Sequence, residues 1–302
     1  MWPNNKKFAF SIIDDTDLST VKNVKAVYDL LYDLGFLTTK TVWPTGLQTK
    51  YGETCEHEEY LQWILSLQKR GFEISFHNAS YDSSYRDKII LGLDKFKDLF
   101  GHYPYTYAQH LFCRENIYWG DSRLTGMHKH LYNLLTRYKN FNRFQGHVSF
   151  SKYFWGDECF RKIKYVRNFC TNKINTLKEY PLMPYHDPLM PFVKYWFASS
   201  LGSNVNLFND CLSEKNIDLL EEEGGACIIY THFSFGFYKD KYLNDRFKYL
   251  MKRISKKNGW FVPVNVLLDY LLQKKGEIII NKKQKKTMEQ KWLLEKIKVG
   301  YS

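Results

Sequence analysis

The chain has 302 residues, of which 44% are hydrophobic and 18% aromatic, so it can form a sizeable core and extensive disorder is excluded. No apolar run reaches the length of a membrane span, and the first fifteen residues become charged too early for a signal peptide. Six scattered cysteines without a CxxC pair favour reduced thiols over a disulfide framework or a zinc ribbon. These features predict a soluble, cytoplasmic protein.

The net charge of +12 is unevenly distributed. Between Lys274 and Lys298 the chain has nine lysines and three glutamates. This tail is either a solvated polar face or a contact for an anionic membrane surface or glycan. No recognised nucleic-acid module is present, so specific nucleic-acid binding is not expected. We divide the chain into a main domain, 1–276, and a basic C-terminal tail, 277–302, with an amphipathic helix around Met288–Ile297.

Strands and helices alternate over the first 110 residues. The predicted strands are Phe8–Ile13, Thr38–Trp43, Phe72–His77 and Tyr105–His110. Between them, helical spacing of apolar residues predicts helices from about Val21 to Gly35, over Glu58–Arg70 and over Arg86–Phe100. Repeated strand–helix units predict parallel strands joined by right-handed crossovers.

The segment 111–220 is less regular and is expected to be a long insertion rich in aromatic loops. Helices are predicted near 123–138 and 157–168, and the loop Met183–Phe197 is expected to cover a site. Regularity then returns. A strand is predicted over Ala226–His232, a helix near 240–255, a strand over Trp260–Val264 and a helix over Val266–Gln273.

Polar side chains stand where several predicted strands end. Asp14 and Asp15 follow the first strand, and His77, His110 and His232 end three others. The carboxyl ends of parallel strands meet at one edge, which is where such folds carry their sites. Taken singly, the aspartates fit a turn or a helix entry and each histidine fits a structural role. Together they favour a converging metal or acid–base site.

Three of these stretches, in order, resemble motifs of the polysaccharide deacetylases, the NodB-type carbohydrate esterases. They are SIIDDTD (Ser11–Asp17), GFEISFHNASYD (Gly71–Asp82) and CIIYTH (Cys227–His232), and GWFVPVNVLLDYL (Gly259–Leu271) is similar to the family's closing strand and helix. TTKTVWP, NIYWG, YFWGD and MPYHDP are closer to a divergent subfamily associated with surface-glycan synthesis. The resemblance covers about residues 6–273 and implies an α/β fold, a distorted (β/α) barrel with parallel strands.

The chain departs from the family pattern at two places. The family has a second histidine four residues after the first, and here that position is Tyr81, followed by Asp82. The family's third motif, an arginine with prolines, is absent near 105–116, where His110 stands instead. We therefore expect Asp15, His77 and His110 to bind a divalent metal, with zinc as the expected ion.

The resemblance implies a metal-dependent hydrolase that removes an N- or O-linked acetyl group from a sugar or glycan intermediate. Asp14 is expected to be the general base and His232 the general acid, while Asp17 is expected only to begin a helix. The candidate substrate-binding residues are Arg114, Asn116, Trp119, His186 and Asp187. Trp155, Tyr185 and Trp196 are further candidates for stacking on sugar rings, although most aromatics here are expected in the core. For His186 and Asp187 a plain structural turn is an equal alternative.

The alternative function is a glycan-binding pseudoenzyme of the same fold, suggested by Tyr81 and the missing third motif. In either case the expected partner is a carbohydrate: a nucleotide sugar, a lipid-linked glycan or a polysaccharide. If the lysine-rich tail is a membrane contact and not a solvated face, it would hold the protein at the inner membrane face.

Overall fold

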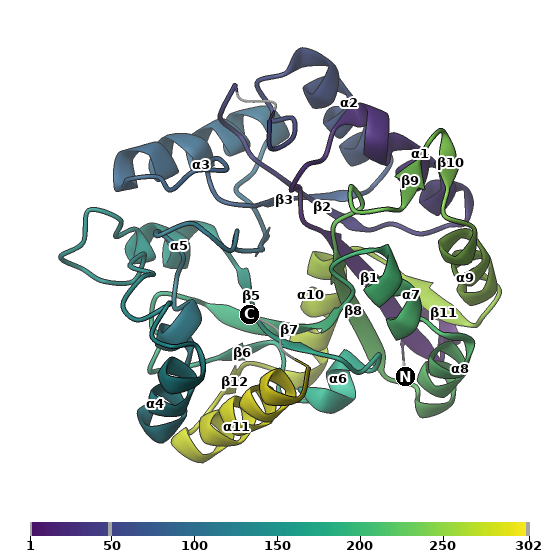
Figure 1. The fold of residues 1–302 in the computed structure, drawn as a ribbon. Coiled ribbons are helices and arrows are strands. Elements are labelled where there is room, and N and C mark those ends of the chain that lie inside the picture. The colour runs from purple at the N-terminus through teal and green to yellow at the C-terminus, as the bar shows by residue number, and fades with distance from the viewer. Residues whose placement is uncertain (1, 48–49, 300–302) are drawn as a thin grey trace.

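A closed barrel of seven parallel strands forms the centre of the protein (Figure 1). The computed structural model describes residues 2–47 and 50–299. Around the barrel the strands run in the order β1, β2, β3, β4, β5, β7, β8, and β8 pairs with β1 to close it. The barrel strands are β1 (Phe8–Asp14), β2 (Thr39–Val42), β3 (Glu73–Phe76), β4 (Thr106–Tyr107), β5 (Tyr165–Thr171), β7 (Tyr195–Leu201) and β8 (Ala226–Thr231). This confirms the predicted distorted (β/α) barrel with parallel strands.

Short strands extend the sheet outside the barrel. These are β6 (Tyr185–His186), β11 (Gly259–Phe261) and β12 (Ile278–Ile279), while β9 (Tyr238–Lys239) and β10 (Tyr242–Leu243) form a separate antiparallel pair. β11 pairs with β1 in parallel, whereas β6 pairs with β7 antiparallel.

Helices surround the barrel, as Figure 1 shows. The α-helices are α1 (Val21–Asp33), α2 (Glu58–Lys69), α3 (Arg86–Phe100), α4 (Gly126–Leu135), α5 (Gly156–Lys162), α6 (Thr176–Glu179), α7 (Val205–Cys211), α8 (Glu214–Glu223), α9 (Asp245–Ser255), α10 (Val264–Lys275) and α11 (Lys282–Val299). Two 3₁₀ turns are η1 (Pro3–Asn5) and η2 (Gly120–Arg123). Within the described residues no helix is both long enough and apolar enough to cross a membrane.

The helix α1 illustrates how local sequence forms these elements. Thr20 caps its N-terminus through a reciprocal pair of hydrogen bonds with Asn23. Val24, Tyr28 and Leu31 then recur at helical spacing and are fully buried against the barrel. The same periodicity forms α2 and α3, close to their predicted bounds.

The segment 111–220 differs from the expectation of a loop-rich insertion, because it contains two barrel strands. β5 begins at Tyr165, so the helix expected over 157–168 is the shorter α5. The aromatic stretch Met183–Phe197 contains β6 and the start of β7. Trp155, Tyr185 and Trp196 are buried in the core and do not line the pocket described below.

Candidate active site

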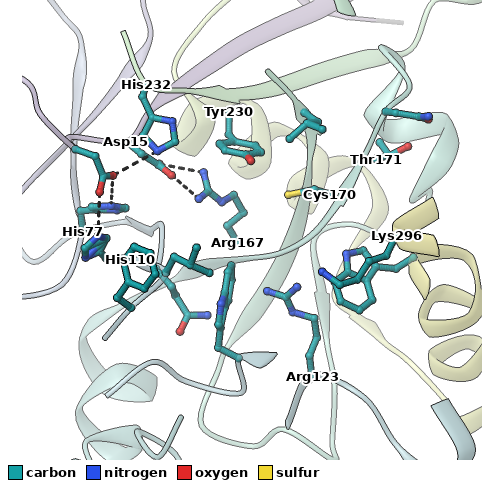
Figure 2. Close-up of a pocket in the computed structure, with 18 of the residues that line it drawn as sticks. Asp15, His77, His110, Arg123, Arg167, Cys170, Thr171, Tyr230, His232 and Lys296 are labelled. Carbon is teal, nitrogen blue, oxygen red and sulfur yellow. Dashed lines mark hydrogen bonds and ion pairs between the residues drawn. The ribbon is translucent and has the colours of Figure 1, made fainter. Parts of the chain in front are cut away.

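One pocket of about 290 Å³ opens at the carboxyl ends of the barrel strands. Asp15 and Asp17 follow β1, His77 follows β3, and His232 follows β8. His110 comes from the loop after β4, while Arg167 and Cys170 lie on β5. The C-terminal helix α11 adds Trp292, Glu295 and Lys296 (Figure 2). The predicted convergence of strand ends thus produces a single cavity.

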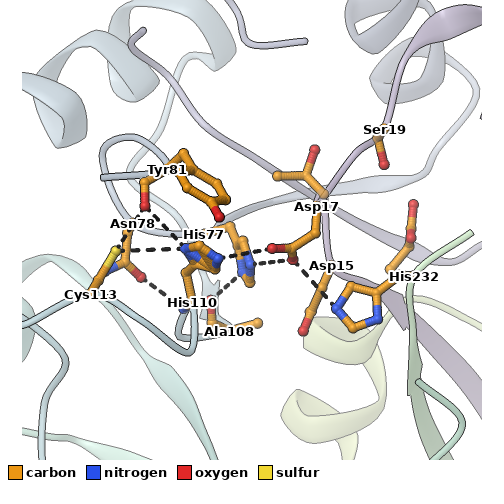
Figure 3. Close-up of polar contacts among 12 residues, drawn as sticks. Asp15, Asp17, Ser19, His77, Asn78, Tyr81, Ala108, His110, Cys113 and His232 are labelled. Atoms are coloured by element: carbon orange, nitrogen blue, oxygen red, sulfur yellow. Dashed lines mark hydrogen bonds and ion pairs between the residues drawn. The ribbon is translucent and has the colours of Figure 1, made fainter. Parts of the chain in front are cut away.

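Asp17, His77 and His110 form a compact cluster inside this pocket. Their potential ligand atoms all lie within 4.8 Å of one another. The Asp17 carboxylate contacts Nε2 of His77 at 3.1 Å through Oδ2 and Nε2 of His110 at 2.9 Å through Oδ1. In Figure 3 both rings point at this carboxylate. Two histidines and one carboxylate are a donor set used for catalytic zinc.

The Nδ1 atoms of His77 and His110, which point away from Asp17, also fit a metal-binding cluster. His77 Nδ1 lies 2.6 Å from the carbonyl oxygen of Ala108, and His110 Nδ1 lies 3.2 Å from that of Tyr81. Because a carbonyl only accepts, each Nδ1 carries its proton and donates it. Burial, and next the charge of His77, lowers the pKa of His110 to about 4, so its ring is neutral near pH 7. The neutral His110 ring then points its Nε2 lone pair at an oxygen of the Asp17 carboxylate. Two electron-rich atoms that face each other in this way are stabilised by a cation bound between them.

Asp15 lies outside this cluster, although it was the predicted carboxylate ligand. Its two oxygens accept hydrogen bonds from Arg167 Nη1 at 3.0 Å and Nη2 at 2.6 Å. Burial alone would raise the pKa of Asp15, but the Arg167 charge and the nearby histidines His77 and His232 lower it below the usual value. A bidentate pair of this kind fixes the carboxylate's orientation. Asp15 is therefore a charged, oriented group beside the Asp17 cluster.

Asp14, the predicted base, is fully buried and does not line the pocket. It forms an ion pair with Lys40 of β2 at 2.8 Å and accepts hydrogen bonds from the Tyr28 hydroxyl and the Phe233 N–H. Successive side chains on a strand point to opposite faces, so Asp14 and Asp15 cannot share one site. Asp14 faces α1 outside the barrel, whereas Asp15 faces the pocket. The surroundings of Asp14 indicate a structural role.

His232 lies where the sequence placed it, in the pocket next to Asp17. Its Nδ1 is 2.7 Å from the Ser203 carbonyl oxygen, and its Nε2 is 3.4 Å from Asp17 Oδ2. Burial alone would lower the pKa of His232, but the contact with Asp17 and the charge of Asp15 raise it above the usual value. The ring can therefore carry a proton near neutral pH, as a general acid must.

Of the predicted substrate-binding residues, only one lines the pocket. Trp119 lines the pocket. Arg114 is exposed to solvent outside the pocket, where its guanidinium lies over the Tyr153 ring. Asn116 is fully buried and holds the loop after β4 by donating to the His110 carbonyl oxygen.

His186 and Asp187 do not reach the pocket either. The His186 ring lies 3.1 Å from the carbonyl oxygens of Val193 and Lys194, and Asp187 forms a buried ion pair with Lys285 of α11. The alternative of a structural turn describes them better than substrate contact.

Comparison of the sequence with protein-family models and with curated proteins finds no match. Solved structures do match. A protein described as a polysaccharide deacetylase from Mycobacterium smegmatis aligns with a TM-score of 0.52 at 11% identity, over 93% of this chain and 96% of its own. The Puue allantoinase aligns with a TM-score of 0.55 at 12% identity, over 91% of this chain and 93% of its own. A protein described as a polysaccharide deacetylase from Pseudomonas aeruginosa PAO1 aligns with a TM-score of 0.52 at 12% identity, over 91% of this chain and 94% of its own.

The chain has the fold of the polysaccharide deacetylases. At 11–12% identity these likenesses concern the fold alone. They confirm the resemblance inferred from the order of the motifs. The cavity of this chain lies at the carboxyl ends of the barrel strands, the end where (β/α) barrels carry their active sites.

Sequence reasoning missed two residues that belong to the group of charged side chains in this pocket. Asp17 was expected only to begin a helix, yet it is the carboxylate of the histidine cluster. Asp17 stands two positions after Asp15, in the turn that follows β1, so the acidic group at this strand end was the available signal. Arg167 was missed because an arginine was sought near 105–116, whereas it comes from β5, one strand later in the barrel.

Proposed function

We propose that this protein is a metal-dependent hydrolase that removes an acetyl group, N- or O-linked, from a sugar or glycan intermediate. The observation that carries the proposal is the grouping of Asp17, His77 and His110 with Asp15 and His232 in one pocket. The deacetylase-type fold supports it. Neither Tyr81 nor the missing third motif now favours a pseudoenzyme, because His110 and Arg167 stand beside Asp17 and Asp15.

Asp17, His77 and His110 would hold the divalent cation, and zinc suits their donor set. Such an ion polarises an acyl oxygen and lowers the pKa of water bound to it.

Asp15 would accept the proton of the attacking water, since its carboxylate is ionised and held in place by Arg167. His232 would donate a proton to the departing amine or alcohol, since its pKa is raised by Asp17 and Asp15. One group that stays deprotonated and one that retains a proton provide the base and the acid at a single pH.

The pocket also sets the size of the group bound at the site. A volume of about 290 Å³ lies just below the roughly 300–1,000 Å³ typical of ligand pockets. One sugar unit with its substituents would fit inside, with any longer glycan extending outward. Placement in the cytoplasm stays a prediction from the sequence.

The test combines zinc content with acetate release. Purified variants are incubated with zinc, desalted and analysed for the metal, and acetate release is measured from 4-nitrophenyl acetate and from N-acetylated sugars. Asp17→Asn, His77→Ala and His110→Ala should each lose zinc and turnover. Asp15→Asn should retain zinc while turnover falls by about 10²–10⁴-fold, the usual contribution of a positioned base.

His130→Ala is the matched control, because His130 is exposed on α4 and away from the pocket. It should keep both zinc and activity. Full zinc binding by His77→Ala and His110→Ala would refute the metal site, and unchanged turnover in Asp15→Asn would refute the base.

A further inference from the structure

Arg123 is a buried cation in the wall of the pocket, contributed by η2. Only 5% of the residue is exposed. Its guanidinium carbon lies 3.9 Å from the centroid of the Trp119 ring and 4.9 Å from that of Trp292. The guanidinium is thus held between two tryptophans, one from η2's entry and one from α11.

Part of the polar edge of this guanidinium has no hydrogen bond to the described residues. Nε and Nη2 of Arg123 are buried and have no hydrogen-bond partner among the described residues. Within those residues no carboxylate lies within ion-pair distance of it either. Burial lowers the pKa of Arg123, yet a guanidinium remains charged in proteins. A buried charge without a counter-ion is normally matched by a ligand or by a partner group.

A second cation lies in the same wall. Lys296 of α11 lines the pocket (Figure 2), and its ammonium nitrogen lies 5.3 Å from the centroid of the Trp292 ring. Burial, and next the positive charge of Arg123, lowers the pKa of Lys296 to about 8. The two cations are therefore close enough to repel each other.

Lys296 contacts the Trp292 and Tyr132 rings, and two further charged groups of the pocket, Arg167 and Glu295, have polar partners. Arg167 is paired with Asp15. The carboxylate of Glu295 accepts hydrogen bonds from the Thr171 hydroxyl at 2.9 Å and the Asn172 N–H at 3.2 Å. Arg123 and Lys296 together thus form a positive region at the side of the pocket away from His77 and His110 (Figure 2).

We propose that Arg123 and Lys296 form a subsite for an anionic group, a carboxylate or a phosphate, on the sugar that enters this pocket. This deepens the proposed function, on which it rests, by naming the substrate class: an acidic or phosphorylated sugar. The anion would accept hydrogen bonds from the guanidinium and the ammonium, while the acetylated part of the same sugar lies near Asp15 and His232. A neutral sugar could accept hydrogen bonds from Arg123 through its hydroxyl groups but would leave the guanidinium charge without a counter-ion.

The test is equilibrium binding, which needs no turnover. Isothermal titration of the full chain uses glucose, glucuronic acid, glucose 1-phosphate and inorganic phosphate as probes. The two anionic sugars should bind at least tenfold more tightly than glucose. Preference between glucuronic acid and glucose 1-phosphate then distinguishes a carboxylate site from a phosphate site, and binding of inorganic phosphate alone supports the latter.

Arg123→Gln should reduce the affinity for anionic sugars to that for glucose, and Lys296→Gln should weaken it by a smaller factor. Arg246→Gln, an exposed arginine of α9 far from the pocket, is the control and should bind as the parent does. If Arg123→Gln does not fold, Arg123→Lys and Lys296→Gln carry the test, because the former keeps the charge but loses the planar fork.

His77→Ala separates this proposal from the proposed function. Anionic sugars should still bind to that variant, because the cationic region lies apart from the Asp17 cluster. Two results would overturn the subsite: anionic sugars that bind no better than glucose, or a folded Arg123→Gln with parental affinity for them. In the second case Arg123 would serve only to join η2 to α11.

Discussion

Asp14, Asp15 and Asp17 lie within four positions of each other and meet three different environments. Asp14 pairs with Lys40 under α1, Asp15 pairs with Arg167 inside the barrel, and Asp17 meets the histidines. The alternation of an extended chain explains the separation of the first two. The three aspartates carry the same charge, so their roles follow from the direction in which each side chain points.

Replacement of Asp14 tests its structural role. Asp14 and Lys40 are both fully buried, so Asp14→Asn should leave an unpaired buried ammonium and lower the free energy of unfolding by about 3–5 kcal/mol. Chemical denaturation followed by tryptophan fluorescence measures this change. The folded fraction should bind zinc normally.

Asp29→Asn provides the comparison, because Asp29 pairs with Lys25 and Arg70 at the surface. Asp29→Asn should lower the free energy of unfolding by less than about 1 kcal/mol. A fully stable Asp14→Asn that has lost turnover would instead restore the catalytic role predicted from the sequence.

At the scale of elements, β5 and β7 are the parts of the barrel that the sequence did not reveal. Nearly every residue of both strands is buried, because one face packs inside the barrel and the other under helices. Such strands lack the alternation of apolar and polar residues that marks a half-exposed strand. In β5 the sequence YVRNFCT even buries two polar neighbours: Arg167 lines the pocket, and Asn168 bonds the buried Tyr185 hydroxyl.

The regular βα units at both ends of the chain were predictable, since their helices carry clear apolar stripes and their strands end in conspicuous Asp or His residues. Three of the site's histidines followed from that placement. Asp17 was overlooked although it lies in the same acidic group after β1, whereas Arg167 was not predictable, because its role depends on which strands become neighbours of β5 in the barrel. Long-range pairing of this kind has no local sequence signal.

The helix α11 is the other element whose role differs from its composition. Its lysines suggested a basic tail outside the main domain, with an amphipathic helix, and the structure shows Met288, Trp292 and Leu293 buried against the barrel and α4. Lys285 and Glu289 are buried as well, the former paired with Asp187 and the latter bonded to Thr125 and His128. The helix is a docked part of the fold.

Two neighbouring leucines test this docking. Leu293 is 2% exposed and Leu294 is 50% exposed. Leu293→Ala should destabilise the protein by about 2–4 kcal/mol, whereas Leu294→Ala should change stability by no more than about 0.5 kcal/mol. Thermal and denaturant unfolding of the pair gives the difference, and equal effects would contradict a docked helix.

At the scale of the whole molecule, the excess of positive charge still allows contact with an anionic membrane. Four α11 lysines remain exposed: Lys282, Lys283, Lys286 and Lys298. We keep the proposal that this surface binds the inner membrane face, now through a docked helix rather than a free tail.

Co-sedimentation with phosphatidylserine vesicles tests the membrane proposal. The triple substitution of Lys282, Lys283 and Lys286 by Gln should weaken binding by about two orders of magnitude, since each lysine contributes about 1 kcal/mol near such a surface. Replacing Lys215, Lys239 and Lys241, exposed and away from α11, with Gln should have little effect. Equal losses would show that only net charge matters, and no loss would reject the proposal.

The docking of α11 also orders the assembly of the molecule. All seven barrel strands precede this helix in the chain, so they emerge from the ribosome before Trp292 and Lys296 do. The barrel can therefore close with the Asp17 cluster in place while one wall of the cavity is still being synthesised. A ligand that touches both Arg123 and Lys296 would then favour the docked helix by mass action, and substrate would help to complete the site that binds it.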